Sequence, residues 1–210
     1  MSAIKTIIFD CDGVILDSVD VKTNAFASLF EEYGDDAVKL ITDYHLRHGG
    51  VSRFEKFKYF FREYLGRSIT ENEMQLLDQK FTKAALAALL KTPFIPGVKE
   101  FISAHHETWP LYVASGAPEH ELRFIFNHLK LTGYFQGVYG SPRPKHEILA
   151  RIVKECEIKP EDALMVGDSH TDLAAALAVG TRFLGVGEFE APHAWMDDLT
   201  GLEKFLKDLA

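Results

Sequence analysis

The sequence predicts an α/β protein, in which a doubly wound parallel sheet carries a block of helices inserted after its first strand. Short apolar runs that end in small or acidic residues alternate with segments of helical periodicity, as in sheets whose strands are joined by crossover helices. Residues from about 18 to 91 interrupt this alternation, because they have helical periodicity and no convincing strand. The two observations together predict a Rossmann-like core with a helical insertion.

Four short apolar runs form the predicted sheet. In chain order they are Ile4 to Phe9, Leu111 to Ala114, Ala163 to Val166 and Arg182 to Val186. The first run leads into Asp10, the second into Ser115-Gly116, the third into Gly167-Asp168 and the fourth into Gly187. Ligands of such sheets bind beyond the carboxyl ends of the strands, so we expect the polar residues at these ends to share one site.

Helices are predicted between these strands, at residues 119–129, 146–156 and 171–178. The inserted block has three apolar stripes at helical spacing, for which core packing is the favoured interpretation. The stripes are Phe26, Leu29, Phe30 and Tyr33; Phe54, Phe57, Phe61 and Tyr64; and Met74, Leu77 and Phe81. Thr70 and Glu73 predict a capping box at the start of the third helix.

The turn dipeptide Pro96-Gly97 marks the return of the chain to the sheet. The predicted organisation is therefore a catalytic core of residues 1–15 and 92–210, interrupted by a helical cap of residues 16–91.

Composition limits the function classes. The chain of 210 residues has a hydrophobic share of 47% and a formal net charge of −8, which is typical of a soluble globular protein and argues against nucleic acid as a partner. No apolar run is long enough to span a bilayer, so we expect no membrane partner and a cytoplasmic location. Cys11 and Cys156 do not form a CxxC pair and are predicted to be buried thiols.

The run DCDGV, after the first strand, is the first chemical signal. A carboxylate can attack phosphorus when a second group protonates the leaving oxygen, and Asp10 and Asp12 could supply these two functions. Gly13 allows the backbone to approach phosphoryl oxygens closely. An ordinary turn is the alternative, since Asp and Gly are common in turns.

Two further signals concern phosphate binding. A hydroxyl and free backbone N–H groups at Ser115-Gly116 could hold a phosphoryl oxygen, although a serine before a glycine after a strand is common. Lys145 is a single cation near the start of a predicted helix. Its alternative is a solvated surface lysine.

The run MVGDSHTD provides the fourth signal, with Asp168 at a strand end and Asp172 four residues later. Hard oxygen ligands near Asp10 suit Mg2+. Helix capping by Asp168 or Ser169 is the alternative, and it is compatible with metal binding.

These four motifs, in this order and each after a predicted strand, resemble the haloacid dehalogenase-like superfamily over nearly the whole chain. The helical insertion resembles the cap of its phosphatase-rich subfamily, which contains phosphoglycolate phosphatases and β-phosphoglucomutase. The resemblance implies a phosphatase that hydrolyses a small phosphorylated metabolite through a phosphorylated Asp10, with Asp12 as general acid and base. It also implies that Ser115, Gly116 and Lys145 hold the phosphate. The implied Mg2+ ligands are Asp10, Asp12 through its carbonyl, and Asp168, with Asp172 supporting the metal shell.

One departure concerns Lys145, which is followed by His146, whereas relatives often have a proline there. Arg143 is a nearby competitor, but the helical run begins directly after Lys145. A dehalogenase is disfavoured because such enzymes lack the second aspartate, here Asp12.

A phosphomutase is the more serious alternative, because the run GVSR in the cap resembles that of β-phosphoglucomutase, although Lys22 stands where that enzyme's relatives have a histidine. A non-catalytic binding protein on the same fold is the third alternative. The catalytic residue types that the chain retains argue against it.

The cap loop from His48 to Arg53 is predicted to contact the substrate. Gly50 permits a close backbone approach, and Arg53 offers donors for a carboxylate, a second phosphate or sugar hydroxyls. The alternative for Arg53 is a solvated residue at a helix start. The other histidines, including His45, are expected to be surface or core residues, and the oligomeric state is left open.

Overall fold

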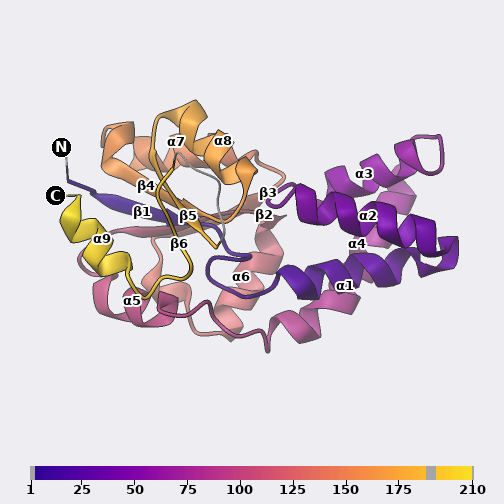
Figure 1. Ribbon diagram of the computed structural model, residues 1–210, viewed down its shortest axis with the longest axis horizontal. Helices are drawn as coiled ribbons and strands as arrows, with labels where there is room; N and C mark the ends of the chain where they lie inside the picture. The colour runs from indigo at the N-terminus through magenta and orange to yellow at the C-terminus, as the bar shows by residue number, and fades with distance from the viewer. Residues whose placement is uncertain (1–2, 188–192, 210) are drawn as a thin grey trace.

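A computed structural model describes residues 3–187 and 193–209 of the chain (Figure 1). Its centre is a six-stranded sheet of order β3-β2-β1-β4-β5-β6, in which all neighbouring strands are parallel. The strands are β1 (Thr6–Phe9), β2 (Leu111–Pro118), β3 (Gly137–Ser141), β4 (Ala163–Gly167), β5 (Arg182–Val186) and β6 (Trp195–Met196). This sheet confirms the predicted fold class.

Helices cover both faces of the sheet (Figure 1). Helices α7 (Lys145–Glu155) and α8 (His170–Val179) cover one face, and α5 (Val98–His105), α6 (Glu119–His128) and α9 (Leu202–Asp208) cover the other. Successive side chains of a strand point to opposite faces, so Ile8 packs with the α7–α8 layer, whereas Ile7 and Phe9 pack in the opposite layer. The described residues also contain three single-turn 3-10 helices: Glu31–Tyr33, Thr132–Tyr134 and Pro160–Asp162.

The four predicted strands are present, and the three predicted helices match α6, α7 and α8 to within one residue at each end. β1 begins at Thr6 rather than Ile4, and β2 continues to Pro118. The sequence analysis missed β3, β6, α5 and α9. β3 is five residues long with two glycines, and β6 is two residues long, so neither has a clear apolar run.

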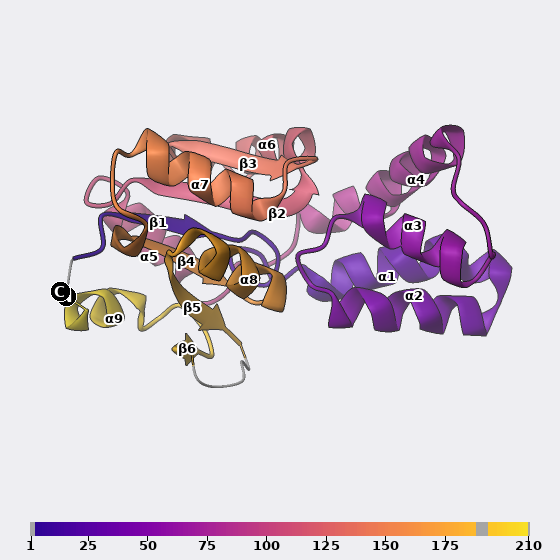
Figure 2. The ribbon, with the colours of Figure 1, turned by 90° about the horizontal axis from the view of Figure 1, so that it is seen from above.

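Four helices form the insertion, one more than the three apolar stripes predict, and they lie beyond the carboxyl ends of the strands (Figure 2). They are α1 (Val19–Phe30), α2 (Asp35–Arg47), α3 (Arg53–Glu63) and α4 (Glu71–Leu89). Both hydrogen bonds of the predicted capping box between Thr70 and Glu73 are present.

Aromatic rings pack at the centre of the cap, as the stripes predict for Phe26, Phe30 and Phe57. The predicted stripe on α3 is wrong in part. Phe60 is buried in place of Phe54, which is half-buried, while Tyr64 lies at the exposed end of the helix.

Two linkers join the cap to the core, and they are hydrogen-bonded to each other. Leu16 forms an antiparallel bridge with Phe94, and the amide of Asp17 donates to the carbonyl of Pro93 at 3.0 Å. The amide of Ile95 donates in turn to the carbonyl of Ile15 at 3.1 Å. This pairing lies within a few residues of the predicted domain boundaries at 15/16 and 91/92. The exact boundaries stay a prediction.

The two cysteines differ in their surroundings. Cys11 is buried, as predicted, but Cys156 is only partly buried, and its Sγ lies 3.4 Å from the Tyr112 hydroxyl. The prediction of a buried thiol is therefore wrong for Cys156, which lies just beyond the C-terminal end of α7. Within residues 3–187 and 193–209, no helix combines the length and apolarity that a bilayer span requires.

Candidate active site

Asp10 lies at the centre of the sheet edge that faces the cap. The register pairs the preceding residue, Phe9, with Val113 of β2 and Val166 of β4, so the end of β1 is flanked on both sides. The amide of Asp10 continues the ladder by donating to the Val166 carbonyl at 2.9 Å. The carboxylate is buried, and its Oδ1 accepts a hydrogen bond from the Cys11 amide at 2.6 Å. The fold thus holds Asp10 in one orientation.

The loop after Asp10 brings the chain close to the strand end that carries Asp168. Gly13 has a φ of +72°, and a Cβ atom there would lie 2.1 Å from the Asp168 Oδ2. Only glycine fits this position, because of both the left-handed backbone and the close approach.

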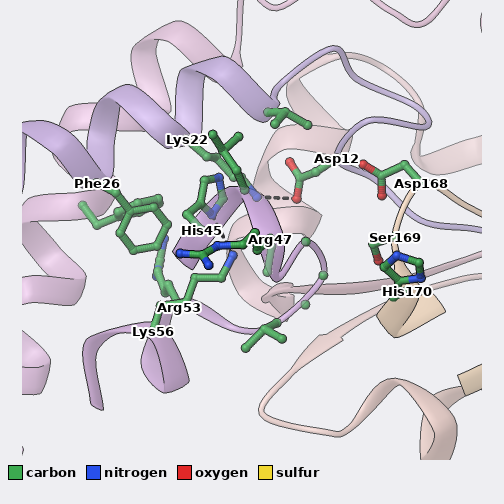
Figure 3. Close-up of a pocket in the computed structure, with 18 of the residues that line it drawn as sticks. Asp12, Lys22, Phe26, His45, Arg47, Arg53, Lys56, Asp168, Ser169 and His170 are labelled. Atoms are coloured by element: carbon green, nitrogen blue, oxygen red, sulfur yellow. Dashed lines mark hydrogen bonds and ion pairs between the residues drawn. The ribbon is translucent and has the colours of Figure 1, made fainter. Parts of the chain in front are cut away.

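The Asp12 side chain faces the cap (Figure 3). Its Oδ1 accepts a hydrogen bond from the Ser18 hydroxyl at 2.6 Å, and its Oδ2 forms an ion pair with the ammonium of Lys22, on the first turn of α1. A cap residue therefore contacts the carboxylate that the sequence analysis assigns as acid and base.

Lys145 connects two of the predicted site carboxylates. It is the first residue of α7, and its Nζ lies 2.9 Å from the Asp10 Oδ2 while also pairing with Asp172. Arg143, the competitor named from the sequence, is exposed. The structure therefore brings Lys145, rather than Arg143, to Asp10.

Ser115 is buried at the carboxyl-terminal part of β2, where its hydroxyl accepts a hydrogen bond from the Ala117 amide at 3.2 Å. Gly116 borders the cavity described below. Both residues therefore lie near the same sheet edge as Asp10, as the motif order predicts.

Three carboxylates form a compact acidic cluster. Single oxygens of Asp10, Asp168 and Asp172 all lie within 4.8 Å of one another. Asp172 has partners on both oxygens, because Oδ1 binds Lys145 and Oδ2 accepts from the Ser169 hydroxyl at 2.6 Å. The Ser169 amide also donates to the Asp172 Oδ2 at 3.2 Å, and the Asp172 amide donates to the Ser169 hydroxyl at 3.4 Å. These two bonds form a capping box, so capping occurs together with membership of the acidic cluster.

The electrostatics of the cluster fit a bound cation. Burial raises the pKa of Asp10 to about 7 against the lowering effect of Lys145, and the nearby Asp172 and Asp12 add to the rise. Burial also raises the pKa of Asp168 well above its ordinary value, and Asp10 and Asp172 add to this shift. Three acids near one lysine leave excess negative charge, which a hard divalent cation such as Mg2+ would neutralise.

At Lys145 and Asp12, neighbouring charges outweigh the effect of burial on the pKa. Burial opposes the charge of Lys145, yet Asp10 and Asp172 outweigh it and raise the pKa of this lysine. Burial likewise opposes ionisation of Asp12, but Lys22 and the Ser18 hydrogen bond outweigh it and lower the pKa of this carboxyl. Asp12 is therefore ionised when Lys22 contacts it.

A cavity of about 550 Å³ lies between the cap and the core (Figure 3). Its core wall includes Asp12, Gly116, Asp168 and Ser169. Its cap wall carries four cationic side chains and one histidine: Lys22, Arg47, Arg53, Lys56 and His45. The cap wall is thus basic and opposes an acidic core wall.

The cap loop closes over one side of this cavity. The Thr171 hydroxyl donates to the Gly49 carbonyl at 2.8 Å, and a Cβ on Gly116 would lie 2.1 Å from the Gly50 carbonyl oxygen. Gly50 has a φ of +72°, and a Cβ there would lie 2.1 Å from the Thr171 Oγ1. These contacts define a closed arrangement of cap and core.

The predicted cap residues occupy different environments. Gly50 lies in the contact, as its expected close approach requires, and Arg53 borders the cavity. His48 is exposed: its ring stacks on Tyr44 at 4.0 Å between centroids, and it is not among the described residues that line the cavity. The structure therefore does not bring His48 to the site, because it follows the last turn of α2 and packs back on that helix.

Arg53 is not the solvated residue of one sequence interpretation, and the substrate contact of the other interpretation stays a prediction. Its side chain is buried, with Nε 2.6 Å from Asp78, Nη1 2.9 Å from Glu121 and Nη2 3.0 Å from the Thr82 hydroxyl. The guanidinium is not solvated, and each of its three nitrogens has a partner within the protein. It links two cap helices to α6 of the core.

His45 and Lys56 are among the cavity residues that the sequence analysis missed. His45 extends the row Ala37-Ile41 on α2 at a spacing of four residues, and Lys56 lies four residues before the buried Phe60 on α3. This spacing is the signal that could have identified both side chains as inward-facing.

The family model for haloacid dehalogenase-like hydrolases matches residues 4–180, which include the core strands β1 to β4 and the whole cap. The chain belongs to this family. The resemblance inferred from the four motifs is thus confirmed, as is the hydrolase class.

Curated relatives of this haloacid dehalogenase-like chain include phosphatases. Phosphoglycolate phosphatase 1 of Pseudomonas aeruginosa is 26% identical over 197 residues, covering 85% of this chain and 67% of the relative. The 6-phosphogluconate phosphatase of Escherichia coli is 24% identical over 193 residues, covering 86% and 81%. The crystal structure of a β-phosphoglucomutase from Clostridium difficile has a TM-score of 0.77 at 17% identity and covers 98% of both chains, so it shares the fold.

Proposed function

We propose that this hydrolase is a Mg2+-dependent phosphatase that cleaves a small phosphate monoester through a phosphorylated Asp10. One observation carries the proposal: Asp10 is buried at the strand end, bonded to Lys145 and within 4.8 Å of the oxygens of Asp168 and Asp172. A phosphoryl group that approached Asp10 would meet a fixed carboxylate and a fixed cation together. The phosphatase names of the curated relatives support the same reaction class.

In the first step, a carboxylate oxygen of Asp10 forms a bond to phosphorus while the bond from phosphorus to the leaving oxygen breaks. Asp12, which can bind a proton only when Lys22 has moved off its carboxylate, gives that proton to the leaving oxygen, so the alcohol departs neutral. In the second step Asp12 takes a proton from water, the hydroxide oxygen bonds to phosphorus, and the Asp10–phosphorus bond breaks. The products are inorganic phosphate and the original Asp10 carboxylate.

The other site residues hold the phosphoryl group and orient the acids. Lys145 would neutralise the transferred group, and the Ser115 hydroxyl and the Gly116 backbone would bind its oxygens. Asp10, the Asp12 carbonyl and Asp168 would hold Mg2+, while Asp172 holds Lys145 and Ser169 in place. When bound, Mg2+ would neutralise the charge of nucleophile and phosphate.

The proposal is tested by phosphate release from a panel of monoesters, first with Mg2+ and then with chelator. We expect release only with Mg2+, poor support by Ca2+, which is larger and tolerates more ligands, and a higher Mg2+ requirement in Asp168→Asn. Full activity in chelator would refute the metal site.

The arrangement favours a phosphatase over the phosphomutase alternative. Arg53 of the GVSR run, which carried the mutase resemblance, is already engaged by Asp78 and Glu121. Lys22 stands at the mutase histidine position and is paired with Asp12. Transfer of the phosphoryl group to a sugar, instead of release to water, would reverse this preference.

A further inference from the structure

Lys56 is a buried cation without a counter-ion in the described part of the chain. Its exposed fraction is 2%, and its Nζ lies 2.7 Å from the His45 Nδ1 and 5.6 Å from the centre of the Phe26 ring. No carboxylate of residues 3–187 or 193–209 lies within ion-pairing distance of it. Arg53, one turn earlier on the same helix, has two carboxylate partners. Lys56 therefore differs from its neighbour in lacking an anion.

An unpaired buried ammonium is unfavourable, because burial removes its hydration and an aromatic face returns only part of the loss. The same side chain could be replaced by an apolar residue of similar volume, so packing alone does not explain a lysine here. Lys56 lines the cavity, where an anion could reach it.

His45 adds a second donor at the same place. Since Lys56 donates to Nδ1, the ring carries its hydrogen on Nε2. This buried atom has no hydrogen-bond partner of good geometry among the described residues, although the Val19 backbone is close enough to raise the pKa of the ring slightly against the other effects. Burial and the positive charge of Lys56 lower the pKa of His45 to about 3, so the ring is neutral. His45 also borders the cavity.

We propose that Lys56 and His45 form a second anion-binding subsite, which takes a carboxylate or a second phosphate at the non-reacting end of the substrate. This inference rests on the proposed function for the reacting end. The two ends fit one cavity of about 550 Å³, with Asp12 and Asp168 on the core wall and the lysine and histidine on the cap wall (Figure 3). A cavity of this size suits a small metabolite.

The subsite differs from the one that the sequence predicted around Arg53. Arg53 borders the same cavity, but each of its three nitrogens already has a partner in the protein, in Asp78, Glu121 and Thr82, whereas Lys56 has no anionic partner among the described residues. The substrate class that follows is a phosphate monoester with a second anionic group, rather than a neutral sugar or alcohol phosphate.

The experiment compares esters that differ only in the distal group: 2-phosphoglycolate against 2-hydroxyethyl phosphate, and 6-phosphogluconate against sorbitol 6-phosphate. We expect the wild-type chain to have a higher kcat/KM for the anionic member of at least one pair. Lys56→Met should lower the ratio of kcat/KM, anionic over neutral, by a factor of about ten to one hundred. The matched control is Lys58→Met on the same helix, whose side chain is exposed and pairs with Glu55, and it should leave the ratio unchanged.

A binding measurement separates this inference from the proposed function. Calorimetry with Mg2+ would compare 3-phosphonopropionate with propylphosphonate, neither of which can be hydrolysed as an ester. The carboxylate compound should bind at least about tenfold more tightly to wild type, and Lys56→Met should abolish the difference. Equal binding of the two compounds by wild type, or an unchanged preference in Lys56→Met, would overturn the subsite whether or not the chain releases phosphate. Absence of phosphate release from every ester, with the binding preference intact, would refute only the proposed reaction.

Discussion

The residues of the site differ in how completely the fold fixes them. Asp10 has a partner on each carboxylate oxygen and a backbone bond to β4, so its position does not depend on the cap. Asp12 depends on the cap, because Lys22 is one of its two side-chain partners. Substitutions at these two carboxylates should therefore differ in what they disturb.

Asp10→Asn should abolish turnover and leave the fold intact. An amide of nearly equal volume is a poor nucleophile and a poor Mg2+ ligand, whereas its oxygen can still accept from the Cys11 amide. Phosphate release and circular dichroism of the purified variant check both statements. Substantial activity in folded Asp10→Asn would remove Asp10 from its proposed role.

The pKa of Lys56 should make the free energy of unfolding depend on pH. Burial, together with Lys22, lowers the pKa of Lys56 to about 7, while Asp12 and Asp168 oppose the shift. Between pH 7 and the ordinary lysine pKa, the unfolded chain binds a proton that the folded chain lacks, so this lysine makes the free energy of unfolding rise with pH. Below pH 7 both states are protonated, and the full penalty of the buried charge applies.

Lys56→Met removes this contribution. The free energy of unfolding of Lys56→Met minus that of wild type should therefore be largest below pH 7 and fall between pH 7 and pH 9.5, by up to about 1.4 kcal/mol per pH unit. Urea unfolding at several pH values measures the difference, with Lys58→Met as the control that shows no such slope. A difference that does not vary with pH would mean that Lys56 titrates normally in the folded chain.

The cap loop between α2 and α3 restricts which residue can stand at position 50, because it meets the core there. Gly50→Ala would add a methyl group 2.1 Å from the Thr171 Oγ1 and 2.9 Å from the Ser169 Oγ, on a backbone with positive φ. We expect the variant to fold but to close its cap poorly, which should lower kcat/KM about tenfold or more.

Gly66→Ala is the matched control for that variant. Gly66 also has a positive φ, of +64°, but a Cβ there would meet nothing within 4 Å. Both variants carry the backbone strain, so a loss of kcat/KM confined to Gly50→Ala reports the contact with Thr171. Equal losses in the two variants would assign the effect to strain alone.

The sequence predicted the elements that have a strong local signal. Long helices with caps and the apolar runs before DCDGV, SG and GDS were recognisable, because burial on one face or on both imposes a periodicity on the chain. β3 and β6 were not recognisable, since their stability comes from pairing with β2 and β5 rather than from their own residues. Site residues of the core were predictable for a related reason: each follows directly on a strand end.

Cap residues were less predictable, because their roles depend on which helices pack together. Arg53 was expected to be free or solvated, yet α4 and α6 supply its partners from positions 25 and 68 residues away. Nothing local to the run GVSR indicates this pairing. His48 was favoured over His45 by its place beside two glycines, whereas the helical row on α2 would have favoured His45.

For the molecule as a whole, Arg53 is a link between the two parts. It joins α3 to α4 within the cap through Asp78, and it joins the cap to the core through Glu121 on α6. Both Arg53 and Glu121 are buried, so loss of the guanidinium would leave a buried carboxylate without its cation.

Arg53→Met should therefore reduce kcat/KM for large and small esters alike, and it should destabilise the closed chain by about 3–5 kcal/mol. Kinetics on a small generic ester and on the best substrate, together with urea unfolding, check both effects. Arg62→Met, at an exposed arginine of the same helix, is the control. A loss confined to the larger ester would restore the direct substrate contact that the sequence suggested.

The ion pair between Lys22 and Asp12 has a consequence for how this chain could diverge. Helix α1 of the cap contacts Asp12, the proposed acid and base, through Lys22, whereas α2 and α3 carry the proposed subsite for the distal group of the substrate. Substitutions on α1 near Lys22 would alter proton transfer for every ester, so they are constrained whatever the substrate is. New substrate specificities should therefore arise by exchange of residues on α2 and α3, at positions such as 45 and 56. A substitution at position 22 should be tolerated only when the catalysed reaction changes as well.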